Sequence, residues 1–195
     1  MKFNQISIKR LIFIARLWPI LSIGIDIYQN NLGANPVEFI ERHFGKWTLI
    51  FLCLTLSMTP LRRITKINQW ILYRRMLGLF VFFYASIHLL CYIGLDYQFA
   101  WLDIKNDIIK HRYVLVGFLG WVLLLLLAIT SSDNMIRRLK ANWKRLHRLV
   151  YLIAILGVLH FIWLVKKDIT EPLIYAAIVL LLFTLRLNFL KTRKF

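Results

Sequence analysis

The sequence of 195 residues is poor in acidic residues and cysteines, and it lacks the short motifs of nucleotide-binding and hydrolytic enzymes. Only nine Asp and Glu are present, and charged residues of both signs make up 18% of the chain, against about 25% in a soluble domain. The two cysteines, Cys53 and Cys91, lie in apolar runs and form no CxxC, no CxxCH haem-attachment motif and no disulfide framework. No G-x-G-x-x-G, P-loop or G-x-S-x-G motif occurs. These absences argue against a soluble enzyme that binds a nucleotide or uses a nucleophilic serine.

What the sequence has in abundance is apolar residues, which make up 59% of the chain and give a mean hydropathy of +0.64. The 26 Lys and Arg produce a formal net charge of +17, which in a soluble protein would suggest a nucleic-acid partner. Here, however, the basic residues stand in short clusters between long apolar runs, as they do in membrane proteins. We therefore interpret the chain as a polytopic membrane protein whose basic loops contact anionic lipid, with no nucleic-acid role.

Six stretches are apolar and long enough, or nearly long enough, to cross a bilayer as helices. They predict an all-α fold, a six-transmembrane-helix bundle formed by a single domain over residues 1–195. The first stretch follows basic residues, as a signal peptide does. It contains Arg16, Pro19 and Asp26 and has no small-x-small cleavage site, so we interpret it as a retained helix. The predicted spans are 11–28, 45–61, 76–94, 113–132, 149–165 and 172–190.

The distribution of basic residues predicts how the spans are oriented. Connections on the side of both termini carry 17 Lys and Arg and one acidic residue, Asp133, whereas the opposite connections carry seven basic and seven acidic residues. Under the positive-inside rule, the N- and C-termini are both cytoplasmic. Arg16 and Arg186 lie near the cytoplasmic ends of their spans, where we expect their long side chains to snorkel to the interface.

Two histidines within the spans are the main candidates for function, because ionisable residues in a membrane are costly. His88 is twelve residues beyond Met76 and His160 eleven beyond Leu149, so both lie roughly 17 Å from the cytoplasmic ends of parallel helices at about 1.5 Å per residue. Imidazoles at one level on facing helices suit the two axial positions of a haem. The alternative is two buried histidines bonded to helix carbonyls or to each other. The neighbours that would wall an apolar haem pocket are Phe80, Phe83, Tyr84, Leu156, Phe161 and Trp163.

A second, inner layer is centred on His147, thirteen residues or about 20 Å before His160. The position thirteen residues before His88 is Arg75, which can pair with a haem propionate or a flavin phosphate but does not ordinarily ligate iron. Thirteen steps leave two residues roughly 140° apart around a helix, so both histidines face one interior only if the helix tilts, kinks or begins after His147. His147 is either a further axial ligand or an interfacial histidine among basic residues.

Other residues gather at the same inner face, where electrons from a quinol or a flavin would enter. A non-haem metal is disfavoured because no carboxylate accompanies the histidines and the nearby Cys91 is better explained by packing. His43 and His111 fall in outer loops and are secondary candidates. The candidate metal ligands are His88, His147 and His160, and the further candidates for cofactor binding are Arg74, Arg75 and Trp143, with Arg145 and Arg148 nearby.

Six strings, in order along nearly the whole chain, resemble the MsrQ (YedZ) family of the ferric-reductase-like transmembrane superfamily. The strings are TPLRR (59–63), RRMLGL (74–79), YASIH (84–88), AITSS (128–132), WKRLHRLVY (143–151) and HFIW (160–163). The resemblance implies a multi-pass protein of the bacterial inner membrane that binds b-type haem, one or two per chain, and to which FMN is also ascribed. It implies that the three family histidines correspond to His88, His147 and His160, and that Arg75 stands where related ferric reductases have a fourth histidine.

The same resemblance implies an electron-transfer subunit of an oxidoreductase complex, without its own methionine sulfoxide active site. Such a subunit passes electrons from the quinol pool, or from a cytosolic flavin reductase, to MsrP, a periplasmic molybdopterin enzyme that repairs oxidised methionines. Two alternatives remain open. One is a stand-alone ferric or quinone reductase, which usually carries an appended flavin and nicotinamide module. The other is a small transporter that uses His88 and His160 as a proton relay, for which carboxylates within the spans would be expected.

Overall fold

The computed structural model describes residues 13–165 and 167–191, with side chains described as far as Arg186. Every regular element in these residues is a helix, so the all-α prediction is confirmed for them. The helices are α2 (Trp18–Tyr28), α3 (Pro36–Thr65), α4 (Trp70–Cys91), α5 (Trp101–Lys110), α6 (Arg112–Ile129), α7 (Asp133–Leu139), α8 (Ala141–Leu146), α9 (Leu149–Leu164) and α10 (Thr170–Lys191), and α4 continues into a π-helical turn, η1 (Tyr92–Asp96).

Four segments of the described chain are long and apolar enough to cross a membrane, as expected of an integral membrane protein. They are α3, α4 with η1 (Trp70–Asp96), α6, and α8 with α9 (Ala141–Leu164). α2 is apolar but has 11 helical residues, and α10 has 22. The count of six spans and the cytoplasmic termini therefore stay predictions.

α3 is much longer than the predicted span 45–61 because strong local signals set both of its ends. The Asn35 side chain accepts a hydrogen bond from the Glu38 N–H at 3.3 Å, and Pro36 occupies the first turn, where a missing N–H costs nothing. At the other end, Lys66 adopts the left-handed conformation that ends a helix. The first turns of α3 contain charged residues, so hydropathy alone did not predict that the helix begins before residue 45.

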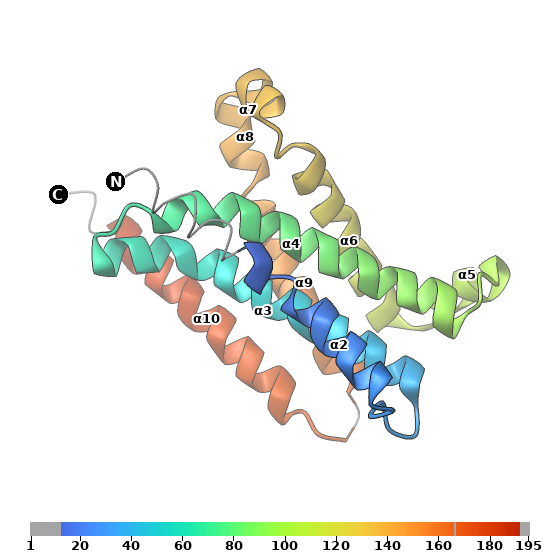
Figure 1. Ribbon diagram of the computed structural model, residues 1–195. Coiled ribbons are helices and arrows are strands. Elements are labelled where there is room, and N and C mark those ends of the chain that lie inside the picture. The colour runs from blue at the N-terminus through green and yellow to red at the C-terminus, as the bar shows by residue number, and fades with distance from the viewer. Residues whose placement is uncertain (1–12, 166, 192–195) are drawn as a thin grey trace.

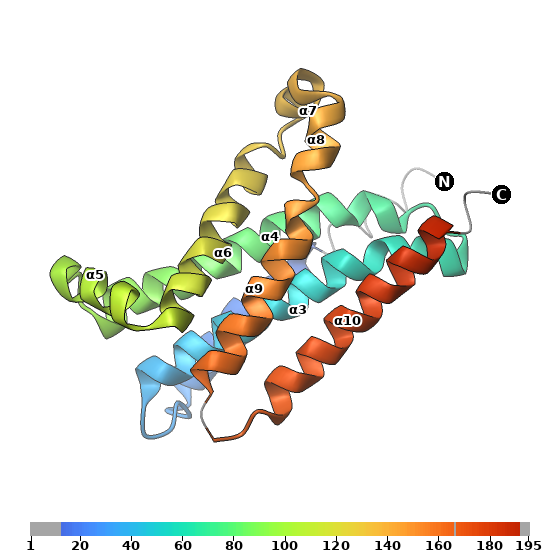
Figure 2. The ribbon, with the colours of Figure 1, turned by 180° about the vertical axis from the view of Figure 1, so that it is seen from behind.

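α3 and α4 form a central antiparallel hairpin, against which α9 and α10 pack, and α6 pairs with α9 (Figures 1 and 2). α7 and α8 project at one end of α6, and α5 projects at the other. The centre of the core is the fully buried Tyr84, whose ring stacks on that of Phe51 with centroids 5.3 Å apart. Its hydroxyl donates to the backbone oxygen of Arg16 at 2.5 Å, which ties α4 to the segment that leads into α2.

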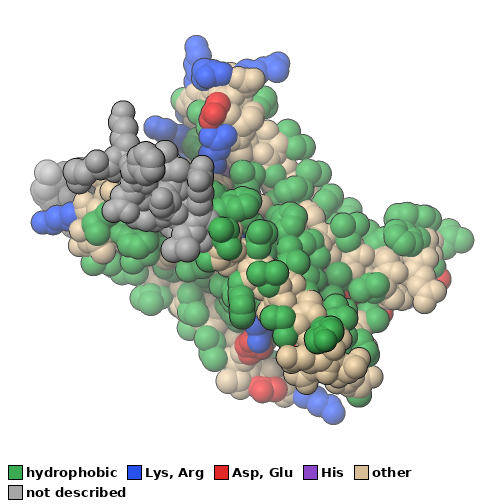
Figure 3. Space-filling model, viewed as in Figure 1, with side chains coloured by type: hydrophobic (Ala, Val, Ile, Leu, Met, Phe, Trp, Pro, Cys, Tyr) green, Lys and Arg blue, Asp and Glu red, His purple; other side chains and the backbone are tan. Residues whose placement is uncertain are grey.

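The surface agrees with a bundle that lies in lipid. Figure 3 shows a broad hydrophobic belt over the helices, with Lys and Arg gathered on the projection formed by α7 and α8 and side chains of both signs at the other end. Exposed apolar side chains, mostly Leu and Ile, recur along α6, α9 and α10; they would be unfavourable in water and are stable against acyl chains.

The expectation that Arg16 and Arg186 snorkel to the interface is wrong. Their side chains are only 4% and 7% exposed and face the interior of the bundle. The Arg16 guanidinium lies 5.6 Å from the ring centroid of Phe80, and Arg186 donates hydrogen bonds to groups on α3 and α9. The positions of both arginines near the ends of predicted spans suggested that they anchor the helices at the membrane surface. In the folded bundle, neighbouring helices instead provide interaction partners for both side chains, and the sequence did not reveal these partners.

The chain between α8 and α9 breaks at His147 and Arg148, which form a turn rather than continuous helix. This break is one of the three arrangements that allow His147 and His160 to face the same interior. α9 begins after His147, so the angular offset of roughly 140° for a straight helix does not apply.

Candidate functional site

His88 of α4 and His160 of α9 lie side by side in the half of the bundle away from α7 and α8, which is the half predicted to be the outer one. Their ring centroids are 6.1 Å apart and the ring planes cross at 78°. A metal–imidazole bond is about 2 Å and a ring centroid lies roughly 1 Å behind its nitrogen, so two opposed axial ligands place their centroids about 6 Å apart. The predicted juxtaposition is therefore observed, and its spacing fits one metal ion held from both sides.

Backbone carbonyls fix which nitrogen of each imidazole carries the proton. His88 Nδ1 donates to Glu41 O at 3.0 Å, and His160 Nδ1 donates to Tyr113 O at 2.8 Å. Because a carbonyl only accepts, Nδ1 must be protonated and Nε2 of a neutral ring keeps its lone pair. Within the described residues neither Nε2 makes a hydrogen bond. An Nδ1–H bonded to a carbonyl with Nε2 open is the arrangement of a metal-binding histidine.

Two glycines make room for these rings. A Cβ on Gly117 of α6 would lie 2.7 Å from His160 Nδ1, and one on Gly45 of α3 would lie 3.3 Å from Cε1 of His88. The first distance is impossible without displacing the ring, and the second is tight. Each histidine ring thus lies against a glycine and bonds the carbonyl four residues before that glycine on the same helix. This glycine cradle holds both rings in place.

Of the residues proposed to wall the pocket, Tyr84 is buried one helical turn before His88, and Phe80 is buried a further turn away, where it packs on Phe51. Phe83 and Trp163 are more than 40% exposed and face outward. His43 lies apart from the pair, because its Nε2 bonds the Pro19 carbonyl at 2.9 Å and so links α2 to α3.

Aromatic rings continue outward from His160, through Tyr113 at 6.3 Å to His111 a further 5.5 Å away. His111 Nδ1 bonds one oxygen of Asp107 at 2.6 Å, and the Tyr92 hydroxyl donates to the other at 2.7 Å. Burial alone would raise the pKa of Asp107, but these hydrogen bonds and the charge of His111 hold that pKa below its usual value. The outer end therefore keeps an ionised carboxylate in contact with His111 and Tyr92.

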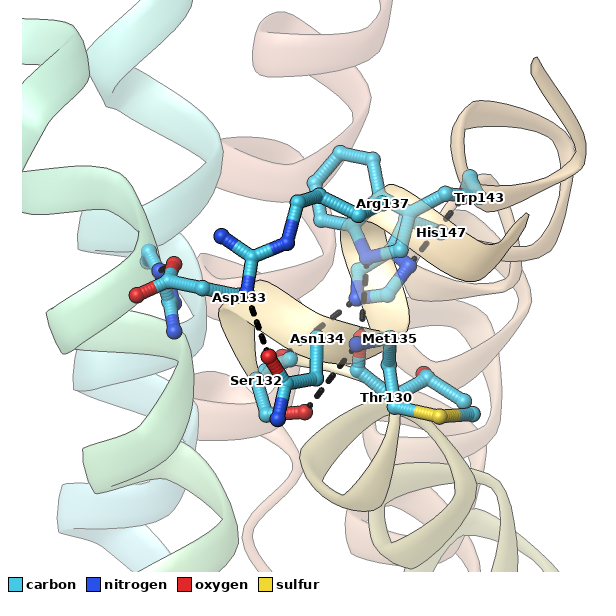
Figure 4. A network of polar contacts seen from close by, with 10 residues as sticks. Thr130, Ser132, Asp133, Asn134, Met135, Arg137, Trp143 and His147 are labelled. Atoms are coloured by element: carbon cyan, nitrogen blue, oxygen red, sulfur yellow. Dashed lines mark hydrogen bonds and ion pairs between the residues drawn. The ribbon is translucent and has the colours of Figure 1, made fainter. Parts of the chain in front are cut away.

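At the inner end, a cavity of about 170 Å³ opens beside the break at His147. The Trp143 and His147 rings stack at 4.0 Å with 27° between their planes, and Trp143 Nε1 donates to Thr130 O at 2.9 Å (Figure 4). The AITSS string at the end of α6 thus holds the WKRLH string in place. The lining residues are Arg74, Trp143, Lys144, His147, Arg148 and Tyr151.

His147 differs from the outer histidines because both of its nitrogens face polar partners. Nδ1 lies 3.2 Å from Trp143 O, and Nε2 lies 3.4 Å from the Ser131 hydroxyl. In the described part of the chain, no second histidine ring packs against it. His147 therefore lies in the wall of a cavity lined by Arg and Lys side chains, with its ring stacked on Trp143.

The adjacent arginines Arg74 and Arg75 have different surroundings. Arg74 lines the cavity, whereas Arg75 is outside the lining and forms an ion pair with Asp133 at the start of α7. Among the described residues no carboxylate pairs with Arg74, Lys144 or Arg148. Guanidinium and ammonium groups without counter-charges attract anionic oxygens, so the inner cavity suits a phosphate, a propionate or the oxygen of a quinol.

Several contributors were missed from sequence: the glycine cradle of Gly45 and Gly117, and the cavity residue Tyr151. Glycine within an apolar span was the available signal for the first two, because it marks close approach of another group. Tyr151 ends the WKRLHRLVY segment, and nothing in the sequence marks it as a cavity residue.

An apolar helical bundle that brings two imidazoles of fixed tautomer together belongs to the class of integral membrane proteins whose facing helices could hold a metal cofactor. Residues 44–158 match the family described as "Ferric reductase like transmembrane component". The chain is 49% identical over 185 residues to the "Protein-methionine-sulfoxide reductase heme-binding subunit MsrQ" of Xanthomonas euvesicatoria pv. vesicatoria (strain 85-10), covering 92% of this chain and 85% of the relative. The protein of the same name from Herminiimonas arsenicoxydans is 46% identical over 182 residues, covering 92% and 84%. The chain belongs to the MsrQ family of haem-binding subunits, within the ferric reductase-like transmembrane family.

Proposed function

We propose that this chain is a b-type haem electron-transfer subunit of the bacterial inner membrane. It accepts electrons from the quinol pool or a cytosolic flavin reductase and passes them to a periplasmic molybdopterin methionine sulfoxide reductase, MsrP. The observation that carries the proposal is the His88–His160 pair, with Nδ1 of each ring bonded to a carbonyl and Nε2 open. The chain itself reduces no methionine sulfoxide, and that chemistry belongs to the partner.

His88 and His160 would hold the haem iron through Nε2, the nitrogen of each ring that the carbonyls leave without a hydrogen bond. Haem, when bound, supplies an iron centre that gains and loses one electron. The Glu41 and Tyr113 carbonyls keep each ring in the ligating tautomer and increase the basicity of Nε2. Buried aromatic residues such as Tyr84 exclude water from the site.

The inner cavity would receive the electron donor. Arg74, Lys144 and Arg148 attract its anionic oxygen, and His147 can take up a proton from it. The cavity is smaller than the roughly 300–1,000 Å³ that encloses a whole drug-sized ligand, so it would accept one end of a quinol or of FMN. A second haem ligated by His147 would need an opposing ligand, and for that reason we favour one haem per chain.

His147→Ala and Arg74→Gln are expected to slow reduction of the outer haem by donor about tenfold or more, while its spectrum stays largely intact. Each variant removes a group that contacts the donor without touching the outer ligands. Stopped-flow reduction with a short-chain quinol or with reduced FMN measures the rate. Arg138→Ala, a charge-matched change on the α7 projection, should leave the rate unchanged. Wild-type rates in both cavity variants would mean that electrons enter elsewhere.

The six-span topology with cytoplasmic termini predicts the location of each connection. Reporter fusions at Asn31, Asp103 and Lys167 are expected to report the periplasm, and fusions at Lys66, Lys140 and the C-terminus the cytoplasm, because basic residues favour the cytoplasmic side. Paired alkaline phosphatase and green fluorescent protein fusions provide the measurement. A periplasmic signal at Lys140 would disprove the six-span arrangement.

A further inference from the structure

Pro60 lies inside α3, in the TPLRR segment, which contributes no residue to the histidine pair or to the lining of the inner cavity. Proline has no N–H, so the carbonyl of Leu56, four residues earlier, loses its helical donor. Leu56 is fully buried, and an unsatisfied carbonyl within a membrane bundle is costly. Arg186 of α10 fills this gap, because its Nη2 donates to Leu56 O at 2.6 Å.

The other arm of the same guanidinium reaches the wall of the inner cavity. Arg186 Nη1 donates to the hydroxyl oxygen of Tyr151 at 2.6 Å. Since that oxygen accepts this bond, the tyrosine proton is free to be donated, and the described residues offer it no acceptor. Tyr151 is one of the residues that line the cavity, and it is close enough to Arg74, another lining residue, to interact with its charge.

The charge of Arg186 is also uncompensated. No described carboxylate forms an ion pair with it, and Arg74 of the cavity lining is close enough to repel it. Two guanidinium groups without counter-ions in a poorly solvated region produce a positive potential that an anionic or acceptor oxygen would relieve.

We propose that Arg186 is a positioning residue for the inner cavity. Held by the carbonyl that Pro60 leaves free, it fixes the Tyr151 hydroxyl so that this group donates a hydrogen bond to an oxygen of the electron donor. The inference rests on the proposed function for the identity of the ligand. The ligand chemistry is an acceptor oxygen, supplied either by a quinone headgroup or by a flavin phosphate.

The test uses the full chain in lipid nanodiscs, with oxidised short-chain ubiquinone and FMN as separate probes in isothermal titration calorimetry. Tyr151→Phe is expected to weaken binding of the recognised probe about tenfold, the effect of one lost hydrogen bond. Arg186→Gln should weaken it by a similar factor, and the double variant should be no worse than either single one, because both remove the same contact. Pro60→Ala should have a smaller effect in the same direction, since the restored N–H competes with Arg186 for the Leu56 carbonyl.

Arg16→Gln is the matched control, because Arg16 is as buried as Arg186 but packs on Phe80, away from the cavity. It should leave both dissociation constants unchanged. Unchanged binding of both probes to Tyr151→Phe, or effects of Tyr151→Phe and Arg186→Gln that multiply, would overturn the proposal. If Arg186→Gln does not fold, Tyr151→Phe and Pro60→Ala still decide the question.

The two probes identify which ligand supplies the acceptor oxygen. Only the probe whose oxygen contacts Tyr151 should bind the variants more weakly. Failure of the proposed function has a different signature. Normal reduction rates in His147→Ala and Arg74→Gln would reject the cavity as the donor site. Slow reduction in those variants together with normal binding by Tyr151→Phe would reject only the positioning role of Arg186.

Discussion

A His160→Ala chain is expected to lose its low-spin haem spectrum, and His88→Ala should do the same. Each imidazole would supply one nitrogen to the iron, because the carbonyl bonds at 3.0 and 2.8 Å engage Nδ1 of both rings and leave Nε2 without a hydrogen bond among the described residues. Removing either ring leaves an iron with one protein ligand in an apolar pocket. The Soret band and the α and β bands of reduced protein, quantified per chain, measure the loss.

Two further measurements separate loss of a ligand from loss of the fold. Added imidazole should restore part of the low-spin signal in both variants, because the free ligand can occupy the space that the side chain vacated. His111→Ala, which removes a histidine at the outer end, should retain the full spectrum. Full-amplitude low-spin spectra in His88→Ala and His160→Ala would show that the iron is held by other residues.

Gly117→Ala is expected to weaken haem retention by about ten- to a hundredfold, although it adds a single methyl group. The new Cβ would lie 2.7 Å from His160 Nδ1, so either the ring or α6 must move, and the hydrogen bond to Tyr113 O is strained. Overpacking of this kind costs about 1–3 kcal/mol, and a ten- to hundredfold effect corresponds to about 1.4–2.8 kcal/mol, within those limits.

Haem content after purification, and the rate of haem transfer to apomyoglobin, measure this effect. Gly24→Ala is the matched control, because a Cβ there meets no atom within 4 Å and the residue also lies in an apolar helix. Gly45→Ala should have an intermediate effect, since its closest contact to His88 is 3.3 Å. Equal haem retention in Gly117→Ala and Gly24→Ala would contradict the glycine cradle.

Much of the site depends on regularities that a sequence displays directly. The levels of His88 and His160 follow from a fixed rise per residue, so counting from the span ends was enough to predict that they meet. The structure places their rings 6.1 Å apart. The helical character of the spans followed equally from their length and hydropathy, because a bilayer admits little else.

The inner layer was less predictable because it depends on which way adjacent side chains point. Arg74 and Arg75 are neighbours in sequence and about 100° apart around α4. Arg74 lines the cavity and Arg75 pairs with Asp133, and the difference follows from which helix lies opposite each side chain in the folded bundle. The ring stack of Trp143 on His147 likewise depends on the break between α8 and α9.

By itself, the sequence determined the class of protein, the helical character of the apolar segments and the level of the paired histidines, because apolar length and helical rise are local properties. The tertiary structure alone decided which nitrogen of each ring is open, because the carbonyls of Glu41 and Tyr113 come from residues 47 positions away. It also decided that Arg186 faces inward, because its acceptor is a Leu56 carbonyl 130 residues distant, left without a helical donor by Pro60. Long-range polar contacts of this kind leave no periodic trace in the chain, so they become visible only when the helices are packed together.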